Sequence, residues 1–207
     1  MEKIIISFIL LFCVKLTYGQ KSDSLNKYDG NGLRTGKWVL HWKGTDKLCR
    51  IENYVADKRF GLCSYYNQDG ELEYEAEYYN DSLNGIYKFY SITGQVEISE
   101  FKRGKKEGVS RYYNYKGILT EDYEFHNNMT NGTHRVFSDK GRALMETTYV
   151  NGYEHGTRYI YRDNDKRENY LQSDWVKGRR IETRYYRKGK LEKTVKDDPN
   201  VPQEIPK

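Results

Sequence analysis

Histidine and cysteine are the side chains that metal sites and catalytic groups use most often, and this sequence holds few of them. The four histidines are His41, His126, His134 and His155, and the three cysteines are Cys13, Cys49 and Cys63. They lie scattered along the chain, whereas ligands and catalytic groups must converge on one point. The sequence also contains no glycine-rich phosphate loop and no other motif of an activated nucleophile. We therefore expect no metal site, no cofactor and no enzymatic activity.

Acidic side chains form a denser pattern in residues 71–77, which read ELEYEAE. Alternate side chains of a β-strand lie on one face, so the four carboxylates are expected to form a single row. They are Glu71, Glu73, Glu75 and Glu77. Such a row could bind Ca²⁺ or a basic partner, but carboxylates along one strand do not converge into the cage that Ca²⁺ prefers. We interpret the row as the solvent-facing side of a strand.

Positive charge is concentrated in residues 177–190, near the C-terminal end. The basic residues there are Lys177, Arg179, Arg180, Arg184, Arg187, Lys188 and Lys190, and Glu182 is the only acid among them. Lysine and arginine on a terminal strand protect a sheet edge from pairing with other sheets. The same charge would attract an anionic surface such as lipid headgroups, glycan or an acidic protein. The candidate residues for that interaction are Arg179, Arg180, Arg184, Arg187 and Lys188.

A regular series of glycines indicates which elements carry these side chains. The series is Gly36, Gly61, Gly85, Gly108, Gly132 and Gly156, with separations of 25, 24, 23, 24 and 24 residues. Five residues after each of the last five glycines stands an aromatic residue: Tyr66, Tyr90, Tyr113, Phe137 and Tyr161. A second aromatic residue stands seven residues before each of the same five glycines: Tyr54, Tyr78, Phe101, Phe125 and Tyr149. A fixed period indicates a repeat protein, in which we expect the glycines to be structural.

Each copy of the repeat reads as a β-hairpin. A second glycine closes a turn such as NQDG or NYKG between two tyrosine-rich stretches, and glycine readily takes the positive φ that such turns require. No proline occurs in residues 21–198, which suits a body made of strands because proline removes a ladder donor. The expected fold is all-β: an elongated single-layer antiparallel meander of about six to seven stacked hairpins and about thirteen strands.

The pattern aromatic-x-x-Gly-x-x-x-Gly occurs from Phe101 to Gly108 and again from Tyr149 to Gly156. It resembles the MORN repeat. The period of about 24 residues, with paired tyrosines and a second glycine, is most similar to the variant MORN repeats of bacterial proteins, some of which are catalogued as antitoxin components. The resemblance covers residues 34–195, which form the expected repeat domain. It implies a repeat fold and indicates little about activity.

The two ends of the chain differ from the repeats. Residues 1–19 contain an apolar run from Ile4 to Val14, which is too short to cross a bilayer, since that takes ~20 residues. A short apolar run that ends in small residues is typical of a cleaved secretory signal, so the protein is expected to be secreted or periplasmic. Residues 20–33 are interpreted as a linker. Residues 196–207 contain all three prolines and are expected to form a disordered tail.

Export would favour a disulfide between Cys49 and Cys63. A simple antiparallel turn between their strands, however, would place Cys63 opposite Tyr54 and Cys49 opposite Gln68, on different faces of the sheet. We therefore expect two free, packed thiols, with a disulfide as the alternative.

Composition narrows the function. The chain has a net charge of only +5 and a mean hydropathy of −0.97, yet it contains 21 tyrosines. Nucleic-acid-binding proteins usually have a concentrated basic face, and so small a net charge does not indicate one. Tyrosine offers apolar area with a polar tip and suits recognition surfaces. We expect a non-catalytic scaffold that binds a protein partner through its aromatic sheet surface, with the candidate residues Tyr66, Tyr90, Tyr113, Phe137 and Tyr161.

Two other functions stay open. The resemblance to repeats catalogued as antitoxin components implies an immunity-like protein that neutralises a toxin. The basic C-terminal end would allow attachment to an anionic membrane surface. In every case most of the tyrosines also have a structural role, because rings stacked on neighbouring strands are the only core that a single-layer sheet has.

Overall fold

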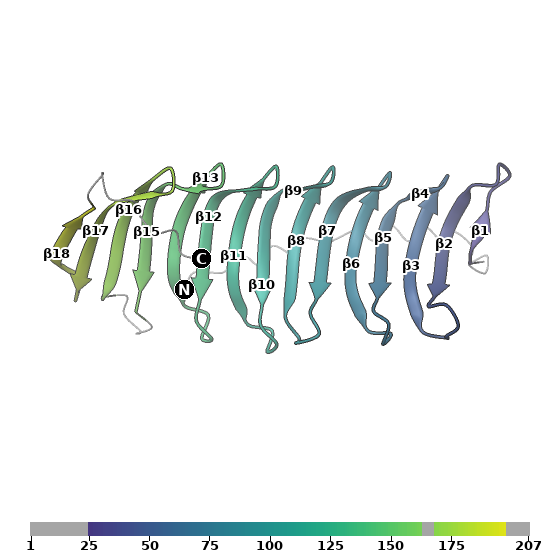
Figure 1. Cartoon of the computed structure of the whole chain (residues 1–207), viewed down its shortest axis with the longest axis horizontal. Coiled ribbons are helices and arrows are strands. Elements are labelled where there is room, and N and C mark those ends of the chain that lie inside the picture. Colours follow the sequence, from purple (N-terminus) through teal and green to yellow (C-terminus); the bar gives the residue numbers. More distant parts are fainter. Residues whose placement is uncertain (1–24, 163–167, 198–207) are drawn as a thin grey trace, which may run out of the picture.

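The structure is a computed structural model that describes residues 25–162 and 168–197. These residues form 18 β-strands and no helix. Figure 1 shows the strands side by side in one curved layer, from β1 at one end to β18 at the other. The expected signal segment and the three prolines lie outside the described residues.

In chain order the first nine strands are β1 (Lys27–Tyr28), β2 (Arg34–His41), β3 (Leu48–Val55), β4 (Lys58–Arg59), β5 (Gly61–Tyr66), β6 (Leu72–Tyr79), β7 (Ser82–Tyr90), β8 (Val96–Lys102) and β9 (Lys105–Lys106). The other nine are β10 (Gly108–Tyr113), β11 (Leu119–His126), β12 (Met129–Phe137), β13 (Ala143–Val150), β14 (Tyr153–Glu154), β15 (Gly156–Tyr161), β16 (Tyr170–Val176), β17 (Arg179–Arg187) and β18 (Lys190–Lys196). Antiparallel pairing follows chain order, as between β10 and β11 and between β11 and β12. The expected single-layer meander is confirmed.

Short interruptions explain why the strands outnumber the expected thirteen. A single residue, Phe60, Glu107 or His155, separates each of the two-residue strands β4, β9 and β14 from the strand that follows it. Each such pair is one long strand with a local irregularity. Counted in this way, the sheet has fourteen long strands and the short β1.

The repeat glycines lie directly across from the aromatic residues of the next strand. Gly61 pairs with Tyr78 and Gly108 with Phe125. Gly108 has a φ of +79°, and a Cβ built on it would lie 2.6 Å from the carboxylate of Glu100. L-residues rarely adopt such a φ, so the backbone conformation favours glycine here, whereas the exposed Glu100 side chain could move away from a Cβ. The structural role expected for these glycines follows from this geometry.

One face of the sheet carries its core. We call it the aromatic face, and it bears Tyr54, Tyr78, Phe101, Phe125, Tyr149 and Trp175. Its rings touch from strand to strand, as in the stacked pair Tyr65 and Tyr74, whose centroids are 4.3 Å apart. Ring pairs of this kind contribute about 0.5–1.5 kcal/mol each beyond their burial. Small residues such as Cys63, Ala76, Ser99 and Ser110 lie buried between the rows of rings.

We call the opposite side the charged face, because oppositely charged side chains alternate across its strands. Arg111 pairs with Asp122, which in turn pairs with Arg135. The Arg135 guanidinium donates two hydrogen bonds of 2.9 and 2.6 Å to the Asp122 carboxylate, which is almost fully buried. A bidentate pair of this kind holds both side chains in place.

The expected domain limits need two small corrections. Part of the expected linker is strand, because β1 pairs with β2 through Lys27 and Tyr28. The Asn26 side chain extends this pairing along β2, because it hydrogen-bonds both the N–H and the C=O of Val39. At the other end β18 includes Lys196, the first residue of the expected tail.

Candidate binding site

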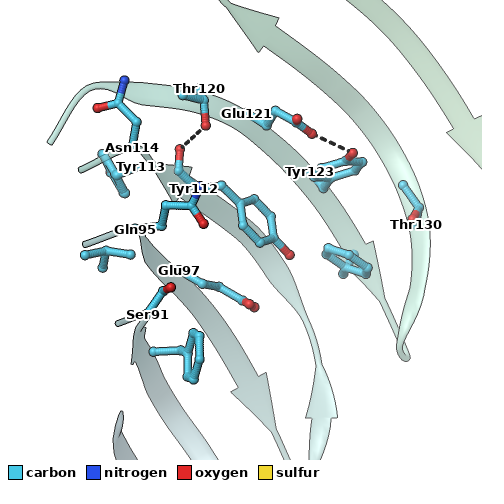
Figure 2. A pocket seen from close by; sticks show the side chains of 13 residues that line it. Ser91, Gln95, Glu97, Tyr112, Tyr113, Asn114, Thr120, Glu121, Tyr123 and Thr130 are labelled. Carbon is cyan, nitrogen blue, oxygen red and sulfur yellow. Dashed lines mark hydrogen bonds between the residues drawn. The ribbon is translucent and has the colours of Figure 1, made fainter. Parts of the chain in front are cut away.

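A hollow of about 530 Å³ opens on the aromatic face over strands β7 to β12. Figure 2 shows its lining side chains, which combine aromatic rings with carboxylates. The lining includes Glu97, Tyr112, Glu121, Tyr123, Phe125 and Thr130. Ligand sites commonly have volumes of about 300–1,000 Å³ and pair apolar walls with a few polar groups. The hollow has the size and the lining of a binding site.

Pairing across the strands explains how these residues come together. Glu97 pairs with Tyr112, and Tyr112 pairs with Glu121. They belong to a row that alternates aromatic and acidic side chains across three neighbouring strands of the aromatic face. The rings of Tyr112 and Tyr123 meet edge to face, with centroids 5.9 Å apart. The two rings thus form a corner beside the carboxylates.

The two carboxylates of the hollow differ in their partners. Glu97 accepts hydrogen bonds from the Lys106 ammonium at 2.7 Å and the Ser99 hydroxyl at 2.6 Å. Glu121 accepts one from the Tyr123 hydroxyl at 2.8 Å, drawn in Figure 2. Burial, and then this bond to Glu121, raises the pKa of Tyr123 above its usual value, so its hydroxyl stays a donor.

His134 borders this region and is neutral near pH 7. Its Nε2 lies 3.5 Å from a Glu121 oxygen, which would be an ion pair only if the ring were protonated. Neither ring nitrogen makes a hydrogen bond within the described residues. Burial lowers the pKa of His134 despite the nearby carboxylate. His134 therefore does not give Glu121 a positive charge near pH 7, and in residues 25–162 and 168–197 no lysine or arginine forms an ion pair with Glu121.

The aromatic residues proposed from the sequence for partner binding lie on the other face. Tyr66, Tyr90, Tyr113 and Phe137 alternate with the residues of the aromatic face, and each pairs with an aliphatic residue of the next strand. All four are half-buried. The fifth, Tyr161, stacks on Tyr159 instead. The row is a set of separate cross-strand pairs, although Tyr113 also borders the hollow.

The prediction that four carboxylates of residues 71–77 share one face is wrong. Tyr65 pairs with Tyr74 but Tyr66 pairs with Leu72, so Glu73 is the extra residue of a β-bulge. A bulge breaks the strict alternation of side chains on which the prediction rested. The row is further dispersed because Glu71 precedes β6.

The basic C-terminal end has more acidic partners than the sequence of residues 177–190 indicated. Arg180 donates hydrogen bonds of 2.7 and 2.8 Å to Asp197. Arg184 bonds Glu182 at 2.7 Å and also contacts Asp174. Both Asp174 and Asp197 lie outside the basic segment in sequence, and the antiparallel register brings them to it. Arg187 lies 3.8 Å from Glu192, while Arg179 and Lys188 occur in the same segment.

The other side chains that could take part in chemistry do not come together. Cys49 and Cys63 are free, as expected, and Cys63 is fully buried. Because Ile51 pairs with Ser64, Cys63 lies beside Glu52 rather than opposite Tyr54. Among the described residues, no three His, Cys, Asp or Glu side chains form a group that could hold a metal ion. In that part of the chain there is also no helix with the length and apolarity to cross a membrane.

Comparisons with known proteins give no family for the chain. No protein-family model matches the sequence, and no curated protein matches it. Sequence reasoning did not find the hollow, although the repeat alignment held the signal. Thr130 stands two residues before Gly132, where Lys106 stands before Gly108. Only the strand register shows that Thr130 lies across from Phe125, so that both line the hollow together with Glu121.

Proposed function

We propose that the protein is an exported, non-catalytic repeat scaffold that binds a protein partner through the aromatic face of its sheet. One observation carries this proposal: the hollow on the aromatic face combines rings with the Glu121 carboxylate, which has no lysine or arginine partner among the described residues. Aromatic residues in well-packed hollows are the usual anchors of protein interfaces. We assign the partner surface to this face rather than to the row from Tyr66 to Tyr161. The rings of that row are separate and half-buried beside charged pairs.

The resemblance to variant MORN repeats is consistent with a scaffold and with the antitoxin alternative, in which the partner would be a toxin. Attachment to an anionic membrane is the weaker alternative. Arg180 and Arg184 already bind carboxylates within the sheet, which reduces the charge that they offer to lipid headgroups.

Affinity capture tests the proposal. The full chain would be expressed in its own host. The purified protein would be compared with a Tyr112→Ala/Phe89→Ala variant, which removes two rings that line the hollow, by mass spectrometry of the proteins that each retains. We expect a partner that the native chain retains and the variant loses. Equal retention by both proteins would contradict the assignment to the aromatic face. Retention by neither protein would contradict partner binding altogether.

A further inference from the structure

One position of the repeat lies two residues before each repeat glycine, beside the rings of the aromatic face. We call it the rim position, and it holds Arg34, Arg59, Leu83, Lys106, Thr130 and Glu154. Basic side chains at this position cover a ring of the next strand. The Arg34 guanidinium lies 4.0 Å from the centre of the Tyr54 ring, and the Lys106 ammonium lies 5.1 Å from that of Phe125. The sheet thus places cations on its own aromatic rings, an arrangement that aromatic quadrupoles favour.

In one copy the rim residue also bonds the side chain that precedes it by nine positions. Lys106 bonds Glu97 in this way, at 2.7 Å. Thr130 bears the same relation to Glu121, nine positions before it. Glu97 and Glu121 occupy equivalent places, since Glu97 pairs with Phe89 and Glu121 pairs with Tyr112, each four residues after a repeat glycine. Two successive copies therefore present the same carboxylate, but only one supplies the cation.

A lysine at position 130 that reached Glu121 as Lys106 reaches Glu97 would extend into the hollow. Thr130 pairs with Phe125 as Lys106 pairs with Phe101. Thr130, Phe125 and Glu121 all line the hollow. The threonine side chain is too short to reach Glu121. The result is an open space with rings along its walls and a carboxylate that its own copy of the repeat does not neutralise.

We propose that this hollow receives a lysine side chain of the protein partner, which takes the place that Lys106 fills in the preceding copy. The methylene stem packs against the rings of Tyr112 and Tyr123, which line the hollow beside Glu121, and the ammonium group binds the Glu121 carboxylate. Charge complementarity supports this occupant, because a half-exposed carboxylate beside aromatic rings favours a cation over a neutral or acidic group. The inference rests on the proposed function and specifies the chemistry that the partner must present.

A short peptide provides the test. The full chain would be titrated calorimetrically with acetyl-Gly-Gly-Lys-Gly-Gly-amide, with the same peptide carrying acetyl-lysine, and with a neutral disaccharide. We expect binding of the lysine peptide and affinity about tenfold weaker for the acetyl-lysine peptide, because charged hydrogen bonds are roughly worth that factor. Equal affinity for both peptides, binding of the disaccharide alone, or no binding of any probe would overturn the proposal.

Two variants and a control locate the site. Thr130→Lys supplies the missing cation from within, so the lysine peptide should no longer bind, and Glu121→Gln should weaken its binding about fivefold or more. Thr148→Lys adds the same charge at an exposed position on the charged face and should bind the peptide like the native chain. Thermal melts would confirm that each variant folds. If Glu121→Gln and Thr130→Lys both bind the peptide normally, the hollow is not its site.

The same variants separate this inference from the proposed function. A captured partner that binds the native chain and the Thr130→Lys variant equally well would leave the scaffold in place and refute the lysine pocket. Loss of the partner from Thr130→Lys, with retention by Thr148→Lys, would support both.

Discussion

The imidazole ring of His134 lies parallel to the phenol ring of Tyr123, with the ring centres 3.8 Å apart and the planes at 10°. His134 lies two residues after a repeat glycine on the aromatic face, where other copies hold Trp38, Cys63, Tyr87, Ser110 and Arg158, and only 6% of its surface is exposed. The histidine therefore serves as an aromatic core residue. A titratable core residue makes stability depend on pH.

We predict that the protein loses stability between about pH 7 and pH 5 through His134. Burial lowers the folded-state pKa, and Arg158 acts in the same direction, whereas Glu121 and Asp122 oppose it. The folded pKa lies below the unfolded value of about 6.5, so the unfolded chain binds the proton more readily. The stabilisation is complete above that value and is lost as the pH falls toward the folded pKa, by about 1.4 kcal/mol per unit of difference.

Thermal melts at pH 7.5 and pH 5.5 measure this dependence. The variant His134→Gln should flatten the pH profile, because it removes the titrating group. The exposed His126, which hydrogen-bonds Glu107, provides the control, and His126→Gln should keep the native profile. A native profile in His134→Gln would show that another group is responsible.

Gly108→Ala should destabilise the fold by about 1–3 kcal/mol, because alanine is strained at the φ of +79° that this position adopts. Gly30→Ala is the matched control. A Cβ at Gly30 meets no atom within 4 Å, and its φ lies outside the positive region. Urea unfolding of both variants would compare them. Equal loss in the two would contradict the role assigned to the repeat glycine.

The period of the glycines and aromatics was enough to predict the single-layer meander, because each copy builds the same hairpin and neighbouring copies stack in order. It could not predict where the alternation of faces breaks. The bulge at Glu73 depends on the register between β5 and β6, which no local pattern reports. The four-carboxylate row failed for that reason.

The sequence could not predict the hollow for a related reason, because its position also depends on the strand register. Thr130 is an ordinary strand residue until the register places it across from Phe125. The ion pairs at the C-terminal end were missed in the same way, since Asp174 and Asp197 reach the arginines only through pairing of separate strands. Repeats predict architecture well, whereas chemistry depends on the positions at which one copy differs from the next.

We predict that the protein does not float with vesicles rich in anionic phospholipid at about 0.15 M salt, where exposed charges are screened beyond ~8 Å. The reason is that Arg180 and Arg184 are engaged by Asp197 and Glu182. Flotation of the native chain that disappears in the triple variant Arg179→Glu, Arg180→Glu, Arg184→Glu would instead support membrane attachment.

Hydrogen-bonded polar side chains lie among the rings of the aromatic face, around Glu52. The Glu52 carboxylate is almost fully buried and accepts hydrogen bonds from the hydroxyls of Tyr54 and Tyr65, each at 2.9 Å. Burial, followed by the bond to Glu52, raises the pKa of Tyr54 to about 12, so its hydroxyl stays a donor. Arg50 completes the group, with its Nε 3.3 Å from Glu52.

Glu52→Ala should lower the free energy of unfolding by about 3 kcal/mol, because it leaves buried hydroxyls and a guanidinium without their acceptor. Glu75→Ala is the control. Glu75 accepts a single hydroxyl bond, from Tyr90, on the half-exposed charged face, so its loss should amount to less than about 1 kcal/mol. Urea unfolding gives both values. If both substitutions lower the free energy of unfolding equally little, the hydrogen bonds between the hydroxyls and Glu52 do not stabilise the aromatic face. Ring contacts alone would then hold the repeats together.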